Sequence, residues 1–462
     1  MSSTSSVANG APGNPQSRGR LLQVLGVWFG IASAIGNTIA AGIVAAQGTI
    51  AGFLPNIWLF LGVWLVGGLY ALFGASSLAE LGAAIPRSGG QYNFSRRALG
   101  EYAGFIVGWS DWLSTAGTNA VVAIVIGNYS AVLLPVFVGY EKYLAVGVLV
   151  LFAILQWQGV KWGSSAQLIT AAIKTLAFVV LVICCFALGG HVRESLAPQF
   201  PNPALPTGWL LAAGFMRALQ KVIYTVDGWD GVIYFGEEVK NPGKDVPRAI
   251  FGSVFSIIGI YLLLSAAVAY LLPMGAISGN EFAMGSAATQ IFGRYGDAII
   301  RSIMVISLLS CINACQMFCT RTLYAMSCDG LFFRRVTHVN KGGTPVLALL
   351  LSTLVACTFI ISKTFIQVID MLAFFFVANY TLSFISLFRL RKTEPDMPRP
   401  YRAWGYPWTT GLALAGSILF LVAAIYTDQE NTPWALGILV MSYPIYRIMK
   451  LFSRKPQSTA QN

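Results

Sequence analysis

The sequence predicts an all-α polytopic membrane protein. Of its 462 residues, 56% are hydrophobic and only 10% are charged, and the mean hydropathy is +0.67. A soluble globular domain carries about 25% charged residues, so most of the surface of this chain does not face water. The apolar residues also gather in runs long enough for helices that cross a bilayer, which need about 20 residues each. The 47 glycines and 12 tryptophans fit this class, because glycine permits close helix packing and tryptophan favours the membrane interface.

Twelve apolar runs predict twelve transmembrane helices. Most loops between them are short and leave no room for a separate soluble domain, and the longer ones are 190–207 and 390–406. Residues 1–20 are rich in Ser, Gly, Asn and Pro and are predicted to be a disordered tail. The predicted spans lie near 22–49, 56–84, 102–135, 143–159, 164–189, 208–236, 250–272, 296–326, 345–362, 366–389, 407–426 and 433–450.

The basic residues are distributed unevenly between the two sides of the membrane. The net charge of +12 taken alone suggests a nucleic-acid partner. When the spans alternate, however, about 22 of the 30 Lys and Arg fall in loops on one side and about five on the other. This is the positive-inside asymmetry of membrane proteins. It places both termini, including the tail 451–462, in the cytoplasm, and we expect no nucleic acid.

The residue patterns of enzymes and of metal or cofactor sites are missing. We find no phosphate-binding loop, no metal-ligand cluster and no nucleophile with a base at a workable spacing. Cys311, Cys315 and Cys319 recur every four residues on one helix face, and we interpret them as small packing residues rather than a soft-metal stripe. The sequence therefore predicts no enzyme, no cofactor and no metal.

Two spans contain polar and small residues where a continuous apolar helix is expected. Small residues crowd 30–43 together with Asn37 and Thr38, and the sixth span contains Asp227 and Gly228. A carboxylate in hydrocarbon is costly and usually faces a bundle interior or a watery cavity. Interrupted helices at corresponding positions of two halves indicate the central site of a transporter. Two other interpretations stay open. The first segment could be a small-residue packing face, and Asp227 could belong to a buried ion pair.

A break in a membrane helix releases backbone groups for binding. Every backbone N–H and C=O in lipid must be satisfied internally, so an unwound segment beside a cavity can offer these groups to a ligand. The N-terminal end of a half-helix suits a carboxylate, and carbonyls at the end of the preceding half suit an ammonium. Two broken helices side by side therefore suit a zwitterion, and an amino acid is the simplest one.

Several stretches resemble the amino acid–polyamine–organocation superfamily of permeases, especially its L-type amino acid transporter branch. Ile-Gly-Asn-Thr-Ile-Ala-Ala-Gly-Ile at 35–43 is similar to the first-helix motif of that family. Ile-Pro-Arg-Ser-Gly-Gly-Gln-Tyr at 85–92 is similar to its first cytoplasmic loop. Further matches are Asp-Gly-Trp at 227–229, Glu-Glu-Val-Lys-Asn-Pro at 237–242 and Thr-Arg-Thr-Leu-Tyr-Ala-Met at 320–326. Each motif is weak alone, but their order over about residues 25–350 is highly specific.

The resemblance implies a transport core at 21–389, made of two inverted five-helix repeats at about 21–189 and 208–389 with broken helices 1 and 6. Helices 11 and 12 and their preceding loop follow at 390–450. The backbone at Ala40, Ala41 and Gly42 would receive the substrate carboxylate. Carbonyls near Ile39 and Tyr224 would receive the amine. The resemblance further implies that Ile43, Val226, Asp227 and Gly228 line the substrate site, and that Tyr224 and Trp229 form a gate over it.

Lys174 matches a helix-five lysine that stands where sodium-coupled relatives bind a cation. The resemblance implies that its ammonium replaces sodium and links helix 1 to helices 5 and 8. Another interpretation is a snorkelling residue at a helix end. Asn119, on helix 3, lines the site or bridges helices. Asp111, on the same helix, either binds a proton that is coupled to transport or makes a structural bond to a helix end.

The chain departs from the family pattern at several positions. Ala40 replaces the first glycine of the helix-one core, and Val44 stands where a phenylalanine often follows. Many relatives have a small residue where Asp227 stands, and some that accept cationic amino acids carry aspartate. This makes cationic amino acids expected substrates, unless Lys221 on the same helix neutralises Asp227.

The loop 135–142 lacks the cysteine with which the eukaryotic heteromeric branch bonds a partner glycoprotein. We therefore expect no disulfide-linked heavy chain, and a prokaryotic inner-membrane protein. The sequence predicts a secondary transporter of L-amino acids that works by alternating access and without sodium, as an exchanger or a facilitator. A polyamine or organic-amine permease and an amino-acid sensor remain the competing interpretations.

Overall fold

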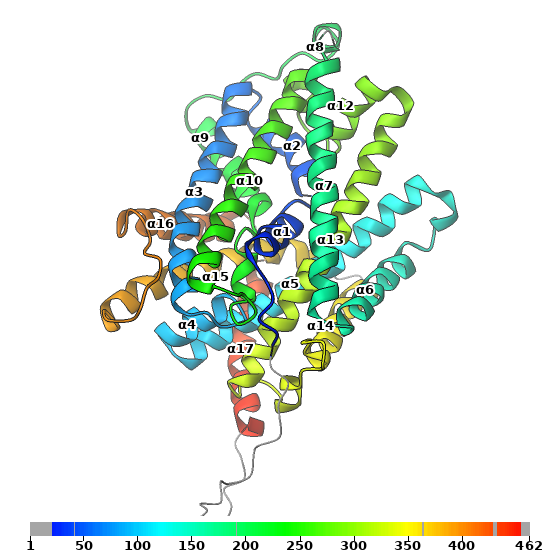
Figure 1. Cartoon of the computed structure of the whole chain (residues 1–462). Helices are drawn as coiled ribbons and strands as arrows, with labels where there is room; N and C mark the ends of the chain where they lie inside the picture. The colour runs from blue at the N-terminus through cyan, green and yellow to red at the C-terminus, as the bar shows by residue number, and fades with distance from the viewer. Residues whose placement is uncertain (1–20, 41, 191, 363–364, 428–431, 454–462) are drawn as a thin grey trace, which may run out of the picture.

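The computed structural model describes residues 21–40, 42–190, 192–362, 365–427 and 432–453, and this part of the chain is almost entirely helical (Figure 1). Within it, β-pairing is limited to isolated bridges such as Leu25 with Val239. The α-helices are α1 Val27–Thr38, α2 Gly42–Phe53, α3 Ile57–Ala84, α4 Gln91–Leu99, α5 Glu101–Leu133, α6 Glu141–Trp157, α7 Val160–Leu188, α8 Val192–Leu196, α9 Gly208–Val226, α10 Pro242–Leu271, α11 Met274–Ile277, α12 Ala283–Phe292, α13 Gly296–Cys328, α14 Val346–Ser362, α15 Phe365–Thr393, α16 Trp408–Thr427 and α17 Thr432–Ser453. Short 3₁₀ helices are η1 Pro135–Phe137, η2 Gly231–Tyr234, η3 Gly293–Tyr295 and η4 Arg334–Thr337.

Long apolar helices confirm a polytopic membrane protein. Within the described residues, six helical segments are long and apolar enough to cross a membrane, and the bent pair α1 and α2 makes a seventh. These two helices meet at an angle of 53°, so the predicted break in the first span is present. The count of twelve spans stays a prediction, because other helices such as α14, with 17 residues, are shorter.

The sixth predicted span, 208–236, differs from the expected pair of half-helices. Helix α9 ends at Val226, and its continuation is only the single 3₁₀ turn η2. The helix ends at Val226 because of the residues that follow it. Gly228 has a φ of +100°, which is outside the right-handed helical region. Beyond η2, Phe235 pairs with Ser88 in an isolated bridge, which leaves no room for a longer helix.

The structure also contains helices that the sequence reading missed. α11 and α12 occupy the connection between α10 and α13 and have 4 and 10 residues. Both are shorter than the roughly 20 residues by which membrane spans are recognised, so a search for spans passes over them.

The helices pack in matching pairs. α3 packs against α10 and α5 against α13, which pairs the second predicted span with the seventh and the third with the eighth. Likewise, α13 packs against α7 while α5 packs against α15. A repeat of five helices would produce these equivalent contacts. The five-plus-five inverted repeat itself stays a prediction. The observed packing places the two helix breaks side by side.

Candidate functional site

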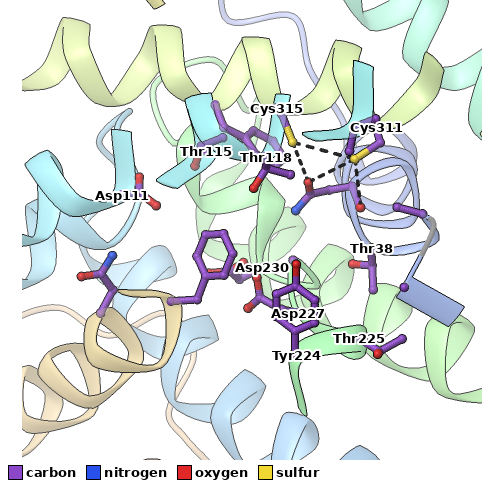
Figure 2. Close-up of a pocket in the computed structure, with 18 of the residues that line it drawn as sticks. Thr38, Asp111, Thr115, Thr118, Tyr224, Thr225, Asp227, Asp230, Cys311 and Cys315 are labelled. Atoms are coloured by element: carbon purple, nitrogen blue, oxygen red, sulfur yellow. Dashed lines mark hydrogen bonds between the residues drawn. The ribbon is translucent and has the colours of Figure 1, made fainter. Parts of the chain in front are cut away.

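A cavity of about 130 Å³ lies where the two broken helices meet (Figure 2). A single water needs a cavity of about 10–15 Å³, so this space is large enough for a small organic molecule. Its walls come from six parts of the bundle: the break between α1 and α2, the end of α9 with η2, and helices α4, α5, α13 and α15. The lining combines polar groups with apolar surface from Val121, Val122, Phe318 and Phe376.

The two helix breaks are in direct contact. A side-chain Cβ at Gly228 would lie 2.1 Å from Asn37 Nδ2 and 3.0 Å from Thr38 Oγ1, so only glycine fits there. The Tyr261 hydroxyl, from α10, donates to the carbonyl oxygen of Thr38 at 2.7 Å and to that of Thr225 at 3.3 Å. These carbonyls belong to the last turns of α1 and α9, where helices leave their carbonyls without intrahelical partners. Tyr261 therefore ties the ends of both broken helices together.

The N-terminal end of α2 faces the cavity. Ala40 and Gly42 both line it. The first turn of a helix has N–H groups without intrahelical partners and a partial positive charge, which suits a carboxylate. Gly42 also lies beside Thr225, because a Cβ at Gly42 would be 3.5 Å from its methyl carbon. Ala41 lies outside the described residues.

Three carboxylates gather on the other side of the cavity. Asp227 and Asp230 lie close together, between Thr38 on one side and Asp111 on the other (Figure 2). The Tyr380 hydroxyl lies close enough to Asp227 and Asp230 to interact with both carboxylates. Asp230 also accepts a hydrogen bond of 2.9 Å from the Gln91 side chain.

Asp111 has its two oxygens occupied by donors from other helices. Oδ1 accepts from the Tyr234 hydroxyl at 2.7 Å, and Oδ2 accepts from Thr322 Oγ1 at 2.9 Å. This geometry fits a structural bond between α5, η2 and α13. It also leaves Asp227 and Asp230 as the acidic groups closest to the helix breaks.

Among the described residues that line the cavity there is no Lys, Arg or His. The lining does include two buried polar atoms without a hydrogen-bond partner, Thr38 Oγ1 and Asn379 Nδ2. Buried polar groups are nearly always paired, so orphan atoms in a cavity wall indicate a place where a ligand or water binds. The arrangement can therefore hold a polar molecule that carries positive charge.

Lys174 lies outside the cavity, behind the break in the first span. Its side chain is fully buried, and its ammonium donates to the carbonyl oxygens of Gly36 at 2.9 Å and Ile39 at 2.8 Å. Ser307, on α13, lies 3.4 Å from the same nitrogen and donates its hydroxyl to Ile39 at 2.5 Å. The lysine is thus no snorkelling end residue, and it connects α7, α1 and α13. Because the Ile39 oxygen already accepts two hydrogen bonds, its lone pairs are filled.

A thiol pair on α13 contacts the break from another side. The sulfur atoms of Cys311 and Cys315 are 3.9 Å apart, and Cys315 donates to Asn37 Oδ1 at 2.9 Å (Figure 2). Groups of three or more metal-ligating side chains are not found among the described residues. The cysteines here pack against the helix break and orient the Asn37 amide.

Contacts close the cavity on the side predicted to be cytoplasmic. Tyr234 stacks on Phe318 with ring centroids 4.6 Å apart, and both rings line the cavity. Below them, Arg321 on α13 makes a bidentate ion pair with Glu238, at 2.9 and 3.1 Å, and both side chains are buried. Further out, Asp329 pairs with Arg87 and Arg96.

The structure brings five of the predicted site residues to the cavity wall, namely Ala40, Gly42, Tyr224, Asp227 and Gly228. Five others do not line it, namely Ile39, Ile43, Val226, Trp229 and Asn119. The Trp229 ring is buried and stacks on Tyr380 instead. The sequence reading missed Asp230, Gln91, Asn379 and Tyr380. Only Asp230 carried a signal, as a second carboxylate in the sixth span, whereas the other three are ordinary polar residues on helices distant in sequence.

Comparison with known proteins decides the family. The family described as amino acid permease matches residues 25–446. The chain belongs to this amino acid permease family. It is a permease of the amino acid–polyamine–organocation superfamily, in the branch that resembles the L-type transporters, and it is not an enzyme.

Three relatives illustrate this branch. The permease is 25% identical over 440 residues to the serine/threonine exchanger SteT of Bacillus subtilis. The matched region covers 93% of this chain and 97% of the relative. It is 28% identical over 439 residues to the large neutral amino acids transporter small subunit 2 of Homo sapiens, covering 92% and 79% of the two chains. It is also 28% identical over 385 residues to the Asc-type amino acid transporter 1 of Mus musculus. This match covers 80% of the permease and 70% of the relative.

Proposed function

We propose that the permease is a secondary transporter that exchanges L-amino acids across the inner membrane by alternating access, with cationic amino acids among its substrates. The observation that carries this proposal is the polarity of the cavity. The N-terminal end of α2 is on one side, and Asp227 and Asp230 are on the other, and the described part of the lining has no basic residue. The α-carboxylate would bind the helix end, and a side-chain ammonium or guanidinium would meet the two aspartates.

Sodium independence follows from Lys174 in this proposal. Its ammonium already supplies a positive charge between α1, α7 and α13, with hydrogen bonds to two carbonyls of the broken helix. A sodium ion bound beside it would meet like-charge repulsion, and its carbonyl ligands would be taken. Exchange is supported by the name of the Bacillus subtilis relative, a serine/threonine exchanger.

Alternating access would use the contacts below the cavity. The Glu238–Arg321 pair and the Tyr234–Phe318 stack close the side where the basic loops lie. Their separation would open the cavity to the cytoplasm, where the charge asymmetry also places both termini. We further propose that the permease works without a disulfide-linked heavy chain, because loop 135–142 has no cysteine.

Uptake into proteoliposomes tests the proposal. Labelled arginine, lysine, leucine, serine and threonine would be offered to vesicles with and without internal amino acid, in sodium and in potassium buffers. We expect uptake that requires internal amino acid, ignores the sodium gradient and includes arginine or lysine. Equally fast uptake into empty vesicles under a sodium gradient would contradict both exchange and sodium independence.

The same vesicles separate the competing functions. A polyamine or organic-amine permease would take up putrescine or spermidine and would not distinguish an amino acid from its decarboxylated amine. A sensor would bind amino acids, as measured by a shift in melting temperature, without transporting them. We expect the amino acid to be transported far better than the amine, because only the amino acid has a carboxylate for the end of α2.

A further inference from the structure

A second cavity lies at the side of the permease, between α3, α9 and α16, and we call it the lateral groove. Its volume is about 270 Å³, larger than that of the central cavity. The lining residues of α3 run from Val66 to Phe73 at spacings of three and four, and those of α9 run from Met216 to Ile223 in the same way. Each helix therefore presents one continuous face to the groove. Figure 1 shows α16 at the outer edge of the molecule, next to α3.

The groove is apolar and opens toward the hydrocarbon of the bilayer. Ten of its twelve lining residues are apolar, and the other two are Tyr70 and Gln220. Leu69, Leu412 and Leu419 at its mouth are 51%, 58% and 52% exposed, and they belong to α3 and α16. Both helices are long and apolar enough to cross the membrane, so the mouth faces lipid chains. An apolar cavity stays dry, so water does not fill this groove.

The groove lies next to the central cavity. The ring of Tyr70 lines the groove, and its hydroxyl is buried without a hydrogen-bond partner. Gly416 allows α16 to approach this ring, since a Cβ there would lie 3.0 Å from it. On α9, Ile223 lines the groove and its neighbour Tyr224 lines the central cavity. The wall between the two spaces is thus one layer of side chains.

We propose that the lateral groove binds one acyl chain of a membrane phospholipid, and that the bound chain supports the side chains that separate the groove from the central cavity. The occupant is a hydrocarbon chain because the lining offers no charge to a headgroup and the mouth opens among lipid-facing leucines. A chain in the groove packs against Tyr70 and Ile223, which line it. Its effect on transport rests on the proposed function, whereas its binding does not.

Photo-labelling tests the binding without any transport. The full-length permease is reconstituted with a phosphatidylcholine that carries a diazirine on its acyl chain, and labelled peptides are mapped by mass spectrometry. We expect label concentrated on 66–73, 216–223 and 412–420. Leu412→Trp, which fills the mouth, should lower this label several-fold, while Leu354→Trp on the exposed face of α14 should not. Label spread over all lipid-facing helices in proportion to their exposure overturns the proposal.

Exchange measurements test the effect of the bound chain on transport. Vesicles would contain phosphatidylcholine with straight or with methyl-branched chains, since branched chains fit the groove poorly, and the headgroup stays the same. We expect wild-type exchange to be several-fold slower with branched chains, and Leu412→Trp to be equally fast with both. The effect of the groove on transport is refuted when Leu412→Trp responds to branched chains as the wild type does, because the difference then comes from the bulk bilayer.

Discussion

The ammonium of Lys174 donates a hydrogen bond of 2.8 Å to the carbonyl oxygen of Ile39, at the residue where the first half of the broken span ends. A second bond reaches Gly36, so the lysine satisfies carbonyls that the break leaves without helical partners. A buried side chain on the fifth predicted span thereby determines the shape of the first. This relationship makes Lys174 the first target for mutation.

Lys174→Ala should slow exchange by roughly tenfold or more, because each hydrogen bond to a charged group contributes about 1.5–3 kcal/mol. Initial rates in proteoliposomes measure this, with size-exclusion profiles to confirm the fold. Lys161→Ala is the matched control, since Lys161 is on the same helix and exposed. Wild-type kinetics in Lys174→Ala would refute a role in coupling.

Asp227→Asn should impair arginine and lysine transport more than leucine or serine transport. The amide keeps the size of the side chain and one acceptor oxygen but removes the charge that faces a cationic substrate. Michaelis constants for both substrate classes measure the effect, and Asp396→Asn in an exposed loop is the control. Equal losses for both classes would point to a structural carboxylate, neutralised by a neighbour such as Lys221.

Gly228→Ala should abolish transport. A non-glycine residue at a φ of +100° is strained by about 1–3 kcal/mol, and the added carbon would lie 2.1 Å from the Asn37 side chain. The two breaks would have to separate. Gly62→Ala, in α3 with no atom within 4 Å of the new carbon, should transport normally. Normal transport by Gly228→Ala would show that the breaks need not touch.

Tyr261→Phe should weaken substrate affinity and lower the free energy of unfolding by about 0.5–1.5 kcal/mol, the usual contribution of a hydrogen bond. The ring and its edge contact with Trp64 remain, but Thr38 and Thr225 lose their shared donor. Tyr270→Phe, on the same helix and 38% exposed, is the control. Thermal unfolding in detergent and binding measurements would detect the difference. Indistinguishable variants would show that the Tyr261 hydroxyl does not hold the two helix ends together.

Arg321→Met should destabilise the closed cytoplasmic side by about 3–5 kcal/mol, because Glu238 is left as a buried charge without its partner. Asp297→Asn, which breaks the more exposed pair with Arg301, should cost less than about 1 kcal/mol. Melting temperatures compare the two. The double variant Glu238→Gln, Arg321→Met should recover much of the loss, and no recovery would show that the pair is not the closing contact.

The sequence by itself determined the class of protein, the break in the first span and the position of the second break. Apolar runs of span length and the small polar cluster around Asn37 are local patterns, and membrane physics restricts what they can become. Asp227 and Gly228 were found in this way, whereas Ala40, Gly42 and Tyr224 came from the family resemblance, and all five line the cavity.

Only the tertiary structure decided the partners of these residues. Asp230 became part of the site when Gln91 and Tyr380 were brought beside it, and Asn119, although on a cavity helix, does not line the cavity. The Ile39 carbonyl was filled by Lys174 and Ser307, which lie 135 and 268 residues away. The second half of the sixth span shortened to one turn because Gly228 and the pairing of Phe235 with Ser88 constrain it. Such contacts join residues far apart in the chain. They form only when the helices pack, so a single sequence does not reveal them.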